Sequence, residues 1–211
     1  MAQAVYELRI YNASGALQYI LDDAAFTYTQ RVNAPGFLQF YVNGTHKVVG
    51  NLSRDYQVEV FRKRAADTGE PNSIANAADF YGFVRDEERR ADSDGNTRVL
   101  YYCPGQMDLL RRAIVAYGAG VADRSAFTTQ KAETILKNLV KYNLTASGTT
   151  GDGRVRNADE TNITIQADGA TGNTLDYACA YATVLEALQE AASIGGGDIN
   201  LVKTAAATWD F

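Results

Sequence analysis

Cysteine and histidine are scarce in this chain, and their scarcity excludes several kinds of chemistry. Among 211 residues there are two cysteines, Cys103 and Cys179, and one histidine, His46. Tetrahedral zinc sites and Cys-x-x-Cys redox motifs therefore have almost no ligands available. We predict a chain with no cofactor, no metal site and no catalytic set built on thiols or imidazoles.

The chain also lacks long apolar runs and an excess of basic charge. Its apolar runs are far too short to span a bilayer, and the opening MAQAVYELRI lacks the basic-then-apolar layout of a secretory signal. The formal net charge of -5 argues against sequence-independent binding to DNA, which needs a clustered basic surface. We expect a protein made in a cytoplasm, without stable membrane insertion.

Aromatic residues are plentiful in this chain, whereas proline is rare. Thirteen tyrosines and eight phenylalanines stand against three prolines, a composition typical of many half-buried strands. In Ala4 to Tyr11, apolar and charged residues alternate with the period of a strand. Asn43-Gly44 and Asp94-Gly95 are hairpin signals, because both residue pairs tolerate positive φ. Strands are predicted at residues 4–11, 16–21, 37–42, 56–62, 80–85 and 97–103.

The apolar period then changes to that of helices. Helices are predicted at about 107–117 and 129–142, and a longer one at Thr174 to Ser193 with Asn173 as its N-cap. A short strand at 162–166 precedes the long helix, and one or two strands at 199–211 follow it. Residues 146–159 are rich in Gly, Thr and Asp, which favours a boundary there. The expected fold is α+β, with one domain at 1–145 and a smaller one at 146–211.

One stretch has part of the spacing of a calcium loop. Asp92, Asp94 and Asn96 could offer oxygen ligands, with Gly95 at the turn. The bidentate Glu at the far end is missing, and Arg98 would oppose a cation. A hairpin tip explains the same residues, and we prefer it.

Other candidates for chemistry have equally simple structural explanations. Cys103 and Cys179 are expected to be small buried hydrophobes, and His46 a lone surface histidine without a triad. Asp152, Asp159 and Glu160 could supply the acid pair of a glycosidase, but no aromatic platform accompanies them. The glycines of Ser147 to Arg154 lack the Lys-Ser/Thr of a phosphate loop, and the charges of Arg85 to Arg90 are typical of a solvated strand end.

Four stretches together resemble a known family. These are YELRIYNASGAL, RVNAPGFLQFYV, YQVEVFRK with DFYGFVRDEERR, and YYCPGQMDLLRRAIV. Their order is similar to that of the tail hub proteins of long-tailed bacteriophages, which are related to the baseplate hub of contractile phages and to the base of type VI secretion spikes. The Asn-x-x-Gly corner of such proteins is similar to Asn33 to Gly36 here. Their F-x-G-x-V strand is similar to Phe80, Gly82 and Val84. The helix AETILKNLVKYN adds to the likeness, which is a loose pattern over most of the chain.

The resemblance implies two β-barrel-like tube lobes with a few packed helices, the second lobe a complete or an incomplete barrel. It implies a homotrimeric ring that joins the tail tube to the tail tip and lines the DNA channel. The implied partners are further copies of the chain, the tail tube or distal tail protein, tail-tip or fibre proteins and the tape-measure protein, with DNA only in transit. The protein would be a non-enzymatic structural protein of the virion tail, assembled in the host cytoplasm.

Two alternatives stay open at this point. Another ring component of the same tail, a hexameric distal tail protein or terminator, would share the composition. A glycan or cell-wall hydrolase would use Asp152, Asp159 and Glu160. Symmetry separates the first alternative from a hub, and alanine substitution of the acids tests the second.

Overall fold

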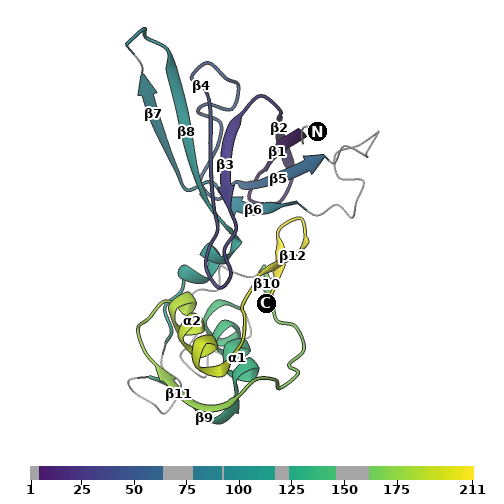
Figure 1. Cartoon of the computed structure of the whole chain (residues 1–211), viewed down its shortest axis with the longest axis vertical. Coiled ribbons are helices and arrows are strands. Elements are labelled where there is room, and N and C mark those ends of the chain that lie inside the picture. The colour runs from purple at the N-terminus through teal and green to yellow at the C-terminus, as the bar shows by residue number, and fades with distance from the viewer. Residues whose placement is uncertain (1–4, 64–77, 92, 117–123, 146–161) are drawn as a thin grey trace, which may run out of the picture. The chain divides into compact units, whose positions relative to one another are not determined.

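The chain, here a computed structural model, divides into two compact units. The structure describes residues 5–63, 78–91, 93–116, 124–145 and 162–211. One unit comprises Met1–Arg31 and Pro35–Gln106, and the other Val32–Ala34 and Met107–Phe211. This division differs from the predicted boundary at 145/146, because the two α-helices on either side of that boundary pack against each other. Figure 1 shows the elements of each unit.

The first unit consists of two four-stranded sheets. One sheet has the order β2-β1-β5-β6 and the other β3-β4-β8-β7, and all of the strand pairs are antiparallel. The strands are β1 (Val5–Tyr11), β2 (Leu17–Leu21), β3 (Ala25–Thr29), β4 (Phe37–Asn43), β5 (Gln57–Lys63), β6 (Phe80–Phe83), β7 (Asp86–Ala91) and β8 (Thr97–Pro104). Two of them, β3 and β7, have no counterpart among the strands predicted from the sequence, which indicated only a solvated strand end at Arg85 to Arg90.

One hydrophobic core lies between the two sheets. Leu8 of β1 is opposite Val60 of β5, and both are fully buried. Phe40 and Tyr101, from the other sheet, stack with ring centroids 4.9 Å apart and are also buried. The alternation predicted for these strands therefore fills the core with every second residue.

The chain crosses from one sheet to the other between β6 and β7. The N–H of Val84 donates to Tyr56 beside β5, and the N–H of Arg85 donates to Tyr102 of β8. The strands are therefore arranged around the core in the order β2-β1-β5-β6, followed by β7-β8-β4-β3. Within the described strands, β2 and β3 do not pair with each other, so no closed barrel is formed by these pairs, and the barrel form of the lobes stays a prediction.

The second unit combines helices with two small sheets. β9 pairs antiparallel with β11, and β13 lies between β10 and β12. In Figure 1 the two α-helices lie side by side, with β9 and β11 running past them. The elements are the 3-10 helix η1 (Gln106–Arg111), β9 (Ser125–Lys131), α1 (Ala132–Leu144), β10 (Ile163–Thr164), β11 (Thr174–Cys179), α2 (Val184–Gly195), β12 (Val202–Ala205) and β13 (Thr208–Asp210).

The helices of the second unit bury apolar stripes around one polar side chain. Ile135 and Leu139 of α1 and Leu188 of α2 are fully buried. Asn143, 6% exposed, accepts a hydrogen bond from the N–H of Ala116 and donates one to the carbonyl of Leu139. Because both ends of the amide are satisfied, this side chain can lie in an apolar core at little cost.

The helix predicted at 107–117 is wrong beyond Arg111. Only η1 is helical, and the N–H of Val115 donates to Ala182 while the N–H of Val184 donates to Ala113. Pairing with this distant segment occupies the backbone groups that an α-helix would need. The helix predicted at 129–142 begins later, at Ala132, because residues 129–131 belong to β9.

The single helix predicted at Thr174 to Ser193 is wrong in its first part and confirmed only where α2 lies. Thr174–Cys179 is the strand β11, paired with β9, and Tyr181 has a left-handed φ of 58° that interrupts the chain before α2. The N-cap is Thr183 instead of Asn173. A helical apolar period in the sequence therefore coincided with a strand that pairing with β9 selects.

Asn43-Gly44 does not form the predicted hairpin. The Asn43 side chain accepts a hydrogen bond from the N–H of Thr45, which begins a series of turns before β5. The hairpin predicted at Asp94-Gly95 is confirmed, since it joins β7 to β8 with Gly95 at φ 79°. The α+β class is confirmed too, and no helix of the described residues is long and apolar enough to cross a membrane.

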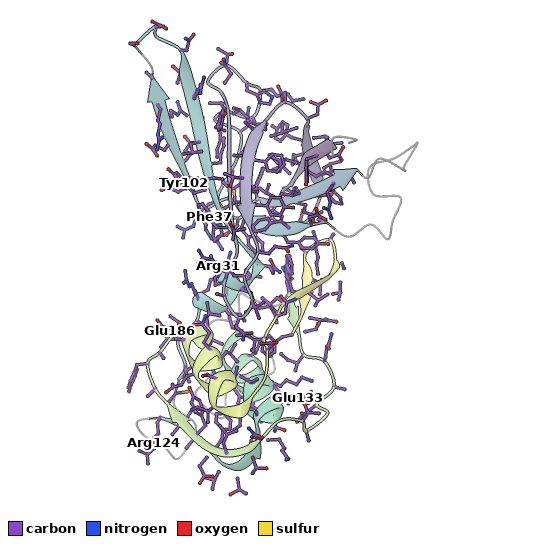
Figure 2. All side chains as sticks on the ribbon, in the orientation of Figure 1. Arg31, Phe37, Tyr102, Arg124, Glu133 and Glu186 are labelled. Atoms are coloured by element: carbon purple, nitrogen blue, oxygen red, sulfur yellow. The ribbon has the colours of Figure 1, made fainter. Side chains whose placement is uncertain are left out.

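The first turn of α2 is held by a capping box. The N–H of Glu186 donates to the Thr183 hydroxyl, and the Glu186 carboxylate accepts from the N–H of Thr183. These bonds lower the pKa of Glu186, whose carboxylate is labelled in Figure 2. The contribution of the carboxylate is therefore present at neutral pH and is lost as the pH falls through its lowered folded-state pKa.

We expect Thr183→Ala to destabilise the second unit by about 1 kcal/mol, because it removes the N-cap acceptor. Urea unfolding at neutral pH measures the loss. Thr183→Ser keeps the hydroxyl and is expected to retain most of the stability, and Ser193→Ala, at an exposed position of the last helical turn, is the neutral control. Equal stability of the Thr183→Ala and Thr183→Ser variants would contradict the capping role.

Candidate assembly surface

The outer face of the β3-β4-β8-β7 sheet carries an unusual number of apolar and aromatic side chains. Leu38, Phe40 and Val42 of β4 point into the core, so the residues between them point outward. In the antiparallel register, Phe37 is opposite Pro104 and Tyr41 is opposite Leu100. We call Phe37, Tyr41, Leu100 and Tyr102 the aromatic stripe.

The aromatic stripe is partly open to solvent. Phe37 is 37% exposed and Tyr41 is 42% exposed. The ring centroids of Phe37 and Tyr102 lie 6.2 Å apart (Figure 2). The Arg98 guanidinium lies 5.6 Å from the centre of the Tyr41 ring. Aromatic side chains on rigid strands present contact area at little entropic cost, so this face is suited to burial against another protein.

A charged border flanks the aromatic stripe along β7. Arg90 donates to Glu88 through Nε at 2.7 Å and Nη2 at 2.9 Å, and the Tyr102 hydroxyl donates to the same carboxylate at 2.6 Å. These hydrogen bonds lower the pKa of Glu88 to about 2. The carboxylate is therefore ionised at neutral pH. Charged side chains beside an apolar stripe resemble the polar rim that surrounds the apolar centre of protein interfaces.

A second polar cluster lies in the second unit, around Glu133 of α1. Its carboxylate accepts from the N–H of Gly169 and the N–H and hydroxyl of Thr171, at 2.7 to 3.0 Å, and from Lys137 Nζ at 2.6 Å. These bonds hold the pKa of Glu133 well below its usual range. Figure 2 labels this side chain, which borders a cleft of about 340 Å³ between the start of α1 and the residues before β11 and after α2.

Glu133 is suited to a structural task rather than to proton transfer. A general base near neutral pH needs a pKa close to the working pH, whereas this carboxylate stays ionised far below it. Three of its four hydrogen bonds tie the chain before β11 to the first turn of α1, and the fourth, from Lys137, lies within α1. The described residues contain no group of three or more His, Cys, Asp or Glu side chains able to hold a metal ion.

The structure places the cysteines and the histidine in structural surroundings. Cys103 is fully buried in the core of the first unit, and burial raises the pKa of its thiol far above the ordinary value. Burial also raises the pKa of the half-buried Cys179. His46 accepts from the N–H of Val48 at Nδ1, and its Nε2 lies 3.6 Å from Asp23. The two thiols lack the lowered pKa of a nucleophile.

The remaining predicted candidates are only partly described. Asp94 and Gly95 lie in the hairpin turn between β7 and β8, and Asp92 lies outside the described residues. The acids of the hydrolase alternative and the glycines of the phosphate-loop comparison, within residues 147–160, also lie outside them. The structure therefore leaves the hydrolase alternative as a prediction.

The aromatic stripe was not among the sequence candidates, although the sequence contains a signal for it. FLQFYV and LYYCP carry apolar residues at both odd and even positions, where a half-solvated strand would alternate. Such a strand is either covered on both faces or exposes an apolar face. The arrangement of the elements decides between these possibilities. Within the described residues, no helix of the first unit covers this sheet, so the apolar face is exposed within its own unit.

Comparison with known proteins places this fold. No protein-family model matches the chain, and no curated protein matches it in sequence. The crystal structure of the tail protein from Neisseria meningitidis MC58 matches 97% of this chain with a TM-score of 0.52 and 10% identity. The fold is similar to that of this tail protein. The resemblance inferred from the four sequence stretches is thereby confirmed at the level of the fold.

A second solved structure was also found. It is the c3393 protein of E. coli, a component of the type VI secretion system that is described as similar to the T4 bacteriophage tail proteins gp27 and gp5. It matches 99% of this chain with a TM-score of 0.47 and 7% identity. The chain covers 49% of the Neisseria protein and 45% of the E. coli protein, so it spans about half the length of each.

Proposed function

We propose that the chain is a structural protein of a bacteriophage tail, forming a homotrimeric hub ring that joins the tail tube to the tail tip and lines the DNA channel. The tail-protein fold over nearly the whole chain supports a role in a tail. The observation that carries the proposal is the aromatic stripe on a sheet face that no helix of its own unit covers among the described residues. A ring needs such faces on every copy.

The proposed ring uses the stripe to contact its neighbours. An aromatic centre with a charged border is the usual anatomy of a protein interface, and the border along β7 excludes water and sets the orientation. The neighbours are further copies of the chain, the tail tube or distal tail protein, the tail-tip or fibre proteins and the tape-measure protein. The net charge of -5 suits a channel wall that lets DNA pass without holding it.

The proposed role is not enzymatic. Glu133, Glu88 and Glu186 are each held as ionised carboxylates by hydrogen bonds, and the thiols of Cys103 and Cys179 are protonated at neutral pH. Such groups stabilise structure and do not exchange protons near neutral pH. The protein is accordingly proposed to reside in the virion tail after assembly in the host cytoplasm.

We expect the double variant Phe37→Ser/Tyr41→Ser to enter assembled tails severalfold less than the unmodified chain, because truncating aromatic side chains at an interface weakens binding strongly. Quantitative immunoblots of purified particles measure the incorporation. Ile20→Ser on β2 is the matched control, since Ile20 is 47% exposed and lies on the other sheet. Normal incorporation of the double variant, with a folded chain, would contradict a role for the stripe.

Cryo-electron microscopy of the same particles tests the ring itself. Three copies around the axis where the tube meets the tip are expected. Six copies would favour a distal tail protein or terminator, and absence of the chain from the tail would overturn the proposal. For the hydrolase alternative, Asp159→Ala/Glu160→Ala should leave wall digestion unchanged; a loss of digestion would support an enzyme.

A further inference from the structure

The edge strand β7 is open to a partner along one side. In the sheet order β3-β4-β8-β7 it is the last strand, and within the described residues it pairs only with β8. All of its residues are exposed except Glu88, which is half-buried. Unpaired edges offer backbone N–H and C=O groups to any strand that approaches, so natural proteins restrict which strands can do so.

The hydrogen-bond pattern shows which backbone groups face outward. Thr97 of β8 accepts from the N–H of Gly44 at the end of β4, so the odd-numbered residues of β8 bond to β4 and the even-numbered ones to β7. In the β7–β8 register, Arg90 is opposite Arg98, an even-numbered residue, so the even-numbered residues of β7 are the ones whose backbone groups bond to β8. The backbone groups of the odd-numbered residues Glu87 and Arg89 therefore point to the open edge.

The order of charges along β7 is complementary to itself when one copy is reversed. An antiparallel second copy, centred on Glu88, places Glu87 opposite Arg89 of that copy and Asp86 opposite Arg90 of that copy. Two-fold symmetry repeats each of these pairs, and residues directly opposite in antiparallel strands share a face. In the same register, Glu87 and Arg89 form the backbone-bonded pair, as their outward groups require.

Other arrangements oppose like charges. In a parallel, in-register contact, Glu87 would meet Glu87 and Arg89 would meet Arg89, and like charges directly opposite each other are unfavourable in a sheet. In the antiparallel arrangement only Glu88 meets its own counterpart, and that carboxylate already accepts hydrogen bonds from Arg90 and Tyr102 of its own chain. The charge order thus favours the antiparallel arrangement centred on Glu88 over the parallel one.

We propose that β7 pairs with β7 of a second copy of this chain, forming a two-fold dimer in which the two sheets become continuous. The partner is specified by charge order and by the outward backbone groups. This contact goes beyond the proposed ring, because a two-fold contact between identical strands does not generate a threefold ring. Its success or failure is independent of the tail role.

Charge exchange on the full-length chain tests the dimer. We expect Glu87→Arg and Arg89→Glu each to weaken self-association roughly tenfold, because each turns two symmetry-related attractive pairs into repulsive ones. An equimolar mixture of the two variants restores pairing, since Arg at 87 then faces Glu at 89 and Arg89 faces Glu87. Sedimentation equilibrium gives the dissociation constants, and circular dichroism confirms that each variant is folded.

Two variants elsewhere on the first unit match these changes in charge. Asp22→Arg and Arg54→Glu lie at exposed positions outside β7 and should leave the dissociation constant unchanged. The proposal is overturned if the unmodified chain stays monomeric up to roughly 100 µM. It is equally overturned if the β7 variants associate as the controls do, or if mixing them restores nothing. A dimer lost in these variants while tails still contain a ring would leave the proposed function intact.

Discussion

Gly82→Ala is expected to destabilise the first unit by about 3 kcal/mol and to lower its thermal unfolding midpoint by roughly 10 °C or more. A Cβ at this position would lie 2.6 Å from the Phe80 ring and 2.7 Å from the Pro104 carbonyl oxygen. Phe80 is 3% exposed, and the carbonyl belongs to the backbone of β8. Overpacking of this kind forces the backbone itself to shift.

Little space is left around Gly82 because it approaches Gly105 closely, and Gly105 in turn approaches Gly36. Gly82 forms a bridge with Gly105, and the N–H of Gly105 donates to the carbonyl of Gly36 at 2.8 Å. A Cβ on Gly105 would lie 2.9 Å from the Gly36 nitrogen, and one on Gly36 would lie 2.5 Å from the Thr29 carbonyl. Backbone therefore packs on backbone where the chain passes from one sheet to the other.

Differential scanning calorimetry of the purified chain measures the effect. Gly197→Ala is the matched control, because a Cβ there meets nothing within 4 Å, and its midpoint should stay close to that of the unmodified chain. A Gly82→Ala variant as stable as the Gly197→Ala variant would show that β6 and β8 do not approach as closely as described.

Asn33→Ala is expected to destabilise the second unit by about 2 to 3 kcal/mol, for two separate reasons. Asn33 has a left-handed φ of 57°, which asparagine adopts at less cost than alanine. Its side chain also accepts from the N–H of Ile199 at 2.7 Å and donates to Asp198 at 2.9 Å. Alanine removes both hydrogen bonds while adding backbone strain.

Two further variants at this position separate the causes. Asn33→Gly removes the side-chain bonds but tolerates the positive φ, so its loss should be about half as large. Asn33→Asp keeps the acceptor for Ile199 and replaces the donor with a carboxylate facing Asp198, so its loss should shrink at acid pH, where the introduced carboxyl group is protonated. Chemical unfolding at neutral and acid pH measures both. Equal stability of all three variants and the unmodified chain would contradict the anchoring role.

Both sites lie in stretches that carried the sequence resemblance to tail hubs. Phe80, Gly82 and Val84 matched a strand motif, and Asn33 to Gly36 matched a corner. The sequence alone indicated a strand and a turn at these positions. It could not indicate why glycine is needed at 82, because the backbone carbonyl that would obstruct a Cβ belongs to Pro104, far along the chain, and folding also brings the Phe80 ring against the site.

The errors of the sequence-based predictions have the same origin. Thr174 to Ser193 has a helical apolar period, yet its first part pairs with β9, about fifty residues earlier in the chain. Residues 112–116 likewise exchange hydrogen bonds with residues 181–184 instead of extending a helix. A periodic pattern reports which side chains prefer burial, and distant strands decide what buries them.

The sequence by itself determined the α+β class, most strands of the first unit and the Asp94-Gly95 hairpin, because alternation, turn residues and composition act between near neighbours or over the whole chain. Only the tertiary structure decided the sheet order, the left-handed role of Asn33, the glycine contacts and the open face bearing Phe37 and Tyr41. These depend on which distant backbones meet, and the free energy of such contacts is not carried by any local pattern.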